Sequence, residues 1–322
     1  MPKYYDYVTT HDTHRRAMKK ERLDWQGDWF VQMLDHLDKS KGLDDRDVKA
    51  TLSQLLAEMM WERDGRPYYS VHPKLVTKLC QVDFSKVPSN LIVTPKPHEV
   101  VCIRLNKEND FLSIEKGKYF LRSMLVWKRS SGTIVNYDDR EFEVQDDVLV
   151  CWMDFGEINE EGDIGIGSPI HTYKCFPIKE GQMIDEAFDH FPPSPDLDIG
   201  VQVPEDFAKN CIKLFISVGF LASSETPLTI FDILNKDIHK WTTATEEERG
   251  RMITRAKKRG KNGFLVGYDQ MFINRDLKYS HIRAGHPHLY WYGPGKSKLK
   301  MRFVAPTTVR KDLSFKDKRN GQ

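Results

Sequence analysis

Helical and strand-like hydrophobic patterns occupy different stretches of this 322-residue chain, and their segregation limits the fold more than any other feature. Residues 10–63 repeat apolar side chains at three- and four-residue spacing, which is typical of amphipathic helices. Residues 98–178 instead contain alternating or β-rich runs, which are typical of strands. Segregated elements favour an α+β fold, whereas alternating ones favour a doubly wound parallel sheet. The sequence therefore predicts an α+β fold with an N-terminal helical pair and a central, mainly antiparallel sheet.

The helical pair is predicted over residues 10–39 and 45–63, and Asp64-Gly65 ends the second helix. Prolines then punctuate residues 65–97, which we expect to form a connecting region with short pieces of structure. The central sheet should contain strands over residues 101–105, 119–128, 148–155 and 170–178.

The C-terminal part should contain a buried helix over residues 204–221 and a second helix opened by a capping box from Thr245 to Glu248. That second helix ends in a basic run, which suits the helix dipole. A basic β-hairpin is predicted after it. The chain thus divides into a helical N-terminal region with its linker (1–97), a β-rich central region (98–200) and a C-terminal region of helices and basic hairpin (201–322).

Charge is distributed unevenly along the chain, although the net charge is only +2. Residues 249–322 hold 19 Lys and Arg against 4 Asp and Glu, a net +15. Residues 1–248 hold 30 basic and 43 acidic residues, a net −13. A basic C-terminal quarter can attract nucleic acid phosphates or the acidic part of its own chain, and composition does not distinguish the two.

The composition predicts a soluble, folded protein, because 39% hydrophobic and 11% aromatic residues are too many for a disordered chain. The longest apolar run, residues 211–222, falls short of the ~20 residues that cross a bilayer. The N-terminus has no apolar segment of signal-peptide type, and the five cysteines form no CxxC pair. We therefore expect a cytoplasmic protein with reduced thiols and no membrane partner.

The most informative segment is the predicted hairpin within residues 279–306, which period-two alternation sorts into two faces. The polar face consists of His286, His288, Tyr290, Tyr292, Lys298, Lys300 and Arg302. The apolar face, which we expect to be buried, consists of Leu289, Trp291, Leu299, Met301 and Phe303. The two strands agree on both faces if Tyr292 pairs with Lys298, Tyr290 with Lys300 and His288 with Arg302.

Rings interleaved with cations suit RNA, because cations meet phosphates and rings stack on bases. The predicted RNA-binding residues are Tyr292, Lys296, Lys298, Lys300 and Arg302 of the hairpin and Lys257, Lys258 and Arg259 of the preceding helix. The same polar face is also compatible with a plain solvated surface whose histidines hydrogen-bond locally.

Metal-independent ribonuclease chemistry is a further alternative, since one imidazole can accept a proton, another can donate one, and a cation can stabilise the phosphorane. The candidates are His281, Arg283, His286, His288 and Tyr290. None is a firm catalytic residue, because no third group positioned to orient the imidazoles is evident, so recognition is favoured over cutting. Three histidines would also suit zinc. Neighbouring Arg and Lys repel a cation, however, so no metal or other cofactor is predicted.

The string His281-Ile282-Arg283-x-Gly285-His286-x-His288-x-Tyr290-Trp291-x-Gly293 resembles the C-terminal signature of the type V-A anti-CRISPR proteins of the second subtype, which phages and plasmids carry. Tyr279, Ser280, Ala284 and Pro287 differ from that family's pattern. A weaker likeness covers residues 204–225 and 263–275. The specific match spans about a tenth of the chain.

This resemblance implies an unusual activity. The characterised relative recognises the N-terminal peptide of the type V-A effector nuclease as it emerges from the ribosome, and the mRNA is then lost. The resemblance thus implies two partners, a nascent N-terminal peptide and the mRNA or translating ribosome. The acidic part of the chain, residues 1–248, would hold the peptide. Residues 65–97 could leave a strand edge open to which the peptide could pair. The target peptide and the oligomeric state do not follow from the sequence.

Overall fold

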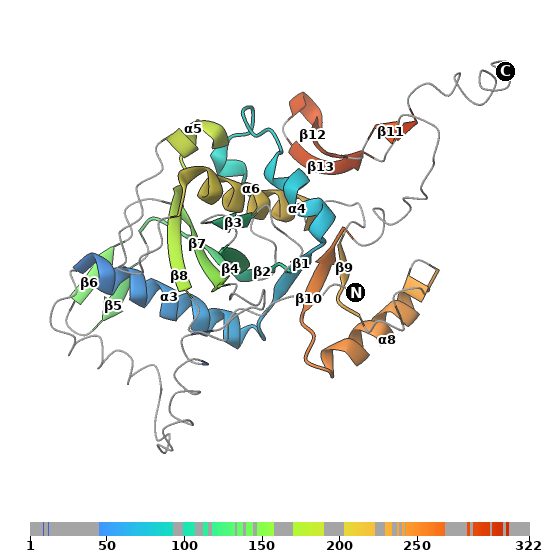
Figure 1. Ribbon diagram of the computed structural model, residues 1–322, viewed down its shortest axis with the longest axis horizontal. Helices are drawn as coiled ribbons and strands as arrows, with labels where there is room; N and C mark the ends of the chain where they lie inside the picture. Colours follow the sequence, from blue (N-terminus) through green and yellow to red (C-terminus); the bar gives the residue numbers. More distant parts are fainter. Residues whose placement is uncertain are drawn as a thin grey trace.

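The computed structural model covers the whole chain, and its described residues are 9, 12, 45–92, 99–106, 112–114, 118–132, 134–137, 140–143, 147–157, 170–189, 203–222, 229–233, 237, 240–241, 243–267, 282–283, 286–296, 298–304 and 307–308. Apart from residue 12, the helix predicted over residues 10–39 lies outside this description. The predicted α+β fold is confirmed: helices flank a mainly antiparallel sheet, and a hairpin lies near the C-terminus (Figure 1).

The main sheet has the strand order β8-β7-β4-β2-β1-β10-β9, with β3 paired to β4. Its strands are β1 (Tyr68–Val71), β2 (Val100–Arg104), β3 (Ser113–Ile114), β4 (Tyr119–Arg129), β7 (Val148–Glu157), β8 (Ile170–Pro177), β9 (Thr229–Phe231) and β10 (Gly263–Val266). The four strands predicted over residues 101–178 are therefore confirmed, and the sheet draws strands from all three predicted regions. A separate two-stranded sheet consists of β5 (Ile134–Tyr137) and β6 (Arg140–Glu143).

The centre of the main sheet is parallel, which the sequence did not predict. β1 pairs in parallel with β2 on one side and with β10 on the other, while the other pairings are antiparallel. Residues 65–97 are therefore more than a connection, since they supply this central strand and the helix α4 (Pro73–Cys80). Because β1 is hydrogen-bonded on both sides, it cannot offer the open edge that was expected of this segment.

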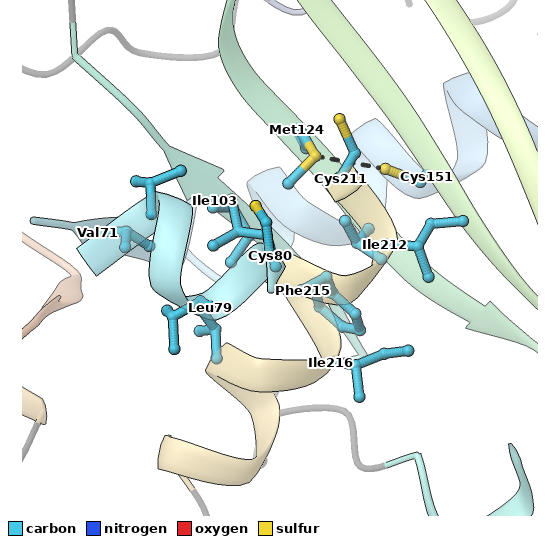
Figure 2. Close-up of a cluster of buried hydrophobic side chains, with 14 of the residues drawn as sticks. Val71, Leu79, Cys80, Ile103, Met124, Cys151, Cys211, Ile212, Phe215 and Ile216 are labelled. Carbon is cyan, nitrogen blue, oxygen red and sulfur yellow. Dashed lines mark hydrogen bonds between the residues drawn. The ribbon is translucent and has the colours of Figure 1, made fainter. Parts of the chain in front are cut away.

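Helices cover both faces of the sheet (Figure 1). On one face α4 and α6 (Glu205–Ala222) pack over the main hydrophobic cluster, in which Phe215, Leu79 and Ile103 are fully buried (Figure 2). On the other face α3 (Asp45–Arg63) places Ala57 and Trp61 over a second cluster. The predicted bounds of α3 are confirmed, and those of α6 differ by one residue at each end. The short helix α5 (Ile184–Asp189) packs beside β8.

Helix α8 (Glu246–Lys257) begins as predicted. The Thr245 hydroxyl accepts a hydrogen bond from the Glu248 amide, and the Glu248 carboxylate accepts one from the Thr245 amide, which completes the capping box. The inner face of α8 buries Met252 and Ala256 against Phe231 of β9. Among the described residues, no helix is both long and apolar enough to cross a membrane.

A buried ion pair lies in the antiparallel half of the sheet. The bulge between Leu121 and Ser123 makes Arg122 an extra residue of β4, and its guanidinium donates to both carboxylate oxygens of Asp154 at 3.0 and 2.9 Å. The Ser123 hydroxyl donates to the same carboxylate at 3.1 Å. A Cβ at position 156 would lie 2.8 Å from the Arg122 side chain, so the glycine there makes room for the pair. Three local features thus support one ion pair.

Candidate functional site

The predicted hairpin forms with the predicted register. Strand β12 (His286–Tyr292) pairs antiparallel with β13 (Lys298–Val304), and the pairs include Tyr292 with Lys298, Tyr290 with Lys300, and His288 with Arg302. Two short flanking strands, β11 (Ile282–Arg283) and β14 (Thr307–Thr308), pair with each other. The agreement follows from the side-chain period of two, since a slip by one residue would exchange the polar and apolar faces.

The turn of the hairpin is built from residues in left-handed backbone conformations. The φ angles are 82° at Gly293, 61° at Gly295 and 55° at Lys296. Glycine adopts such angles without steric cost, so the sequence Gly-Pro-Gly permits a tight reversal. The amide of Lys296 donates to the carbonyl of Gly293 at 3.1 Å and closes the turn.

The base of the hairpin is anchored on the helical layer. Met301 is fully buried, and Leu289 and Leu299 pack partly buried against the main hydrophobic cluster. Strand β13 contacts α6, and β12 contacts α4 (Figure 1). The hairpin thus stands on the face of α4 and α6 that points away from the sheet, and its apolar side chains hold it there.

The polar face carries rings and cations in direct contact. The rings of His288 and Tyr290 meet edge to face, with their centroids 4.6 Å apart. The ammonium of Lys300 lies 4.5 Å from the ring centroid of Tyr292, within the range of a cation–π interaction. His288 and Arg302 are exposed. Imidazole, phenol and ammonium groups therefore form one accessible surface, as the alternation predicted.

The prediction that the whole apolar face is buried is wrong for Trp291, because 37% of its surface is exposed. Alternation identifies the face on which a side chain lies, but it does not tell whether another element covers that face. Within the described part of the chain, the exposed large hydrophobic residues are Met59, Tyr290, Trp291 and Tyr292. Three of these four are consecutive, so exposed aromatic surface is concentrated at the tip of one hairpin.

The five candidates for catalysis are only partly described. His281 lies outside the described residues, as do the side chains of Arg283 and His286, whose backbones pair with Thr307 and Val304. His288 and Tyr290 lie side by side on β12. Their grouping with the other three therefore stays a prediction.

The predicted RNA-binding residues fall on two separate surfaces. Lys296, Lys298, Lys300 and Arg302 lie on the hairpin, whereas Lys257, Lys258 and Arg259 are exposed at the end of α8, far from it in Figure 1. The described basic residues of the C-terminal quarter therefore lie on two surfaces and not in one patch. The hairpin combines cations with exposed rings, and for this reason it is the stronger candidate.

Other ionisable groups give no competing site in the described part of the chain. No group of three or more His, Cys, Asp or Glu residues there could hold a metal ion. Cys80, Cys151 and Cys211 approach one another between α4, β7 and α6, and Cys151 lies 3.6 Å from the sulfur of Met124 (Figure 2). Burial raises the pKa of the Cys80 thiol to about 12 and that of Cys211 well above its usual range. These three thiols are part of the hydrophobic core, and a neutral buried thiol is a poor nucleophile, so we assign them no catalytic role.

Comparison with known protein families gives a match over most of the chain. The model of a family described as AcrVA2-like, the anti-CRISPR type V subtype A2 family, matches residues 69–311. The matched span includes nearly all of the main sheet, α4, α6, α8 and the hairpin. No curated protein matches the chain.

Proposed function

The chain belongs to the AcrVA2-like family of anti-CRISPR proteins, and from this membership we propose that it lowers production of a type V-A CRISPR effector nuclease. It recognises the effector's N-terminal peptide as the peptide leaves the ribosome, and the effector mRNA is then lost. The family match supports the anti-CRISPR role over three quarters of the chain. The peptide and mRNA steps rest on the likeness of the C-terminal signature to that of the characterised relative.

The observation that carries the proposal is the exposed hairpin. A translation-coupled silencer needs a surface that contacts RNA, whether of the message or of the ribosome. Tyr290 and Tyr292 are 39% and 42% exposed and lie opposite Lys300 and Lys298. Rings of this kind stack on bases, and the cations neutralise phosphates. The hairpin acts as the RNA-facing surface.

The peptide binds to the acidic part of the chain, residues 1–248. Among the described residues, β8 and β9 are the outermost strands of the main sheet, and an extended peptide would add to one of them. Strand β8 is the better candidate, because its eight residues offer a longer edge than the three of β9. Backbone pairing would supply affinity, and neighbouring side chains would select the sequence.

Three reporter messages test the proposal in cells that express the protein. The first carries the N-terminal codons of a type V-A effector, the second carries synonymous codons, and the third carries the first sequence shifted out of frame. We expect the first two mRNAs to be lost and the third to persist, because the peptide is what is recognised. Loss of the third message, or of none, would overturn the proposal.

A metal-independent ribonuclease is the second candidate, and the exposed His288 opposite Arg302 and beside Tyr290 favours it. Purified protein would then cleave RNA in the presence of a chelator, with a bell-shaped pH profile near neutrality. Binding without cleavage would instead leave the cutting to a host nuclease, which is the outcome we expect.

A further inference from the structure

The tip of the hairpin presents aromatic surface on both of its faces. We call Tyr290, Trp291 and Tyr292 the aromatic tip. Side chains alternate along β12, so the two tyrosines lie on one face and Trp291 on the other. Each is at least 37% exposed. A one-sided docking surface would need only one of these faces, so the partner of the tip must surround it.

All charged residues of the hairpin are basic, which limits the chemistry of that partner. Lys298, Lys300 and Arg302 repeat every second residue, about 7 Å apart along β13, and Lys296 lies in the turn. A repeating line of cations matches a repeating line of phosphates better than the scattered carboxylates of a protein surface. The partner therefore combines regular negative charge with flat apolar groups, as RNA does.

We propose that the aromatic tip selects RNA whose bases are unpaired and unstacked. In a duplex the base faces are covered by their neighbours, and the deep major groove of A-form RNA is too narrow to admit side chains. The flat faces of the rings would then have nothing to contact. In a single strand every base offers a face for stacking, and ribose and phosphate remain accessible to the lysines. The inference deepens the proposed function and rests on it, since it names the form of RNA that the hairpin meets.

The base of the hairpin is fixed on the core, so the aromatic tip is a rigid binding element and not a flexible arm. Met301 is fully buried, with Leu289 and Leu299 beside it on the core. The tip therefore projects from a fixed base, and its rings lose little further freedom when a base stacks on them. The cation–π contact of Lys300 with Tyr292 also holds a cation beside the ring, where a phosphate next to the stacked base would lie.

The test compares two labelled RNAs of identical composition, an unstructured 20-mer and a perfect duplex, with the full-length protein at fixed salt. We expect wild type to bind the unstructured RNA at least about 10-fold more tightly. Tyr292→Leu should weaken binding of the unstructured RNA about 10-fold, because the ring on which one base stacks is lost. Binding of the duplex should not change. Tyr292→Phe, which keeps the ring, should bind like wild type.

Two matched controls carry substitutions of exposed residues far from the tip. Met59→Ala removes an exposed large hydrophobic side chain of α3, and Lys179→Gln removes an exposed cation. Both should bind the two RNAs as wild type does. Thermal unfolding of every variant excludes loss of fold as the cause.

Three outcomes would overturn the inference: equal binding of the two RNAs by wild type, equal loss on both in Tyr292→Leu, or no RNA binding at all. The last would point to an acidic protein partner. Failure of this test leaves the reporter test of silencing intact, because that test depends only on message loss. Cross-linking in cells then distinguishes the source, since message and ribosomal RNA give different cross-linked sequences.

Discussion

The main sheet with its helices, which we call the body, differs from the hairpin in where it places cations and aromatic rings. In the body the cation of Arg122 is 12% exposed and bound to Asp154, which is fully buried, and rings such as Phe155 and Phe215 are buried too. On the hairpin the cations Lys298 and Arg302 are exposed, and rings face the solvent. Burial makes charge and aromatic surface part of the folding free energy, whereas exposure keeps them available for a partner. Stability and binding should therefore separate between the two regions.

The largest effect on the body should come from alkaline pH. Burial raises the pKa of Cys80 and of Tyr69 to about 12 in the folded protein, from ordinary values of 9.0 and 10.0. A raised pKa means that this contribution to stability is complete below about pH 9 and is lost as the pH rises towards 12. Circular dichroism followed from pH 8 to 12 should show cooperative unfolding in this window, together with appearance of the thiolate. A folded state with ionised thiols would contradict the burial argument.

Loss of the buried carboxylate should be the largest effect of a single substitution. Asp154→Ala leaves Arg122 without its carboxylate, and we expect a cost of about 3–5 kcal/mol in the free energy of unfolding. Urea denaturation measures this cost. The control is Asp147→Ala, which removes a carboxylate that is 31% exposed, pairs with Lys128 and accepts two hydrogen bonds from Ser131, and it should cost about 2 kcal/mol or less. Equal losses would mean that burial does not determine the strength of the pair.

Crowding at the parallel centre should have the next largest effect. A Cβ at position 263 would lie 2.3 Å from the carbonyl oxygen of Tyr68, so Gly263→Ala must push β10 away from β1. We expect a loss of about 1–3 kcal/mol. Gly250→Ala is the opposite case, because it lies within α8 with open space around it, and it should stabilise by roughly 0.5–1 kcal/mol. Thermal melts of both variants give the comparison.

The hairpin should show the smallest effect on stability and the largest on function. His288→Ala changes an exposed polar position, so the free energy of unfolding should move by less than about 0.5 kcal/mol while silencing of the reporter is lost. A thermal midpoint equal to that of wild type, combined with lost silencing, would support the separation of stability and binding between the two regions. Unfolding of this variant would contradict that separation.

The sequence predicted the hairpin better than the body for a physical reason. The hairpin has one polar and one apolar face, so alternation fixes its register. All four residues of β1 are buried, with neither face exposed, so Tyr68–Val71 carries no alternation and the central strand was missed. The capping box of α8 was predictable because four adjacent residues determine it.

The candidate site was predictable in its residues but not in its exposure. The alternation of side chains placed Trp291 on the same face as Met301, yet Trp291 is 37% exposed and Met301 is fully buried. That difference depends on how far α4 and α6 extend beneath the hairpin, which involves residues more than a hundred positions away in some cases. The ion pair of Arg122 and Asp154 was missed for the same reason, because a bulge and a distant strand bring the two together.

The central position of β1 affects how the protein is made. The partners of Tyr68 are Cys102 on one side and Gly263 on the other, so the second edge of β1 stays open until most of the chain has been translated. At about 5–20 residues per second, the wait lasts on the order of 10–40 s. During that time the open edge of an apolar strand can pair with other chains. A chaperone at the ribosomal exit would reduce this risk of aggregation. The hairpin follows β10 in the chain, so it too can form only after residue 304 has been translated.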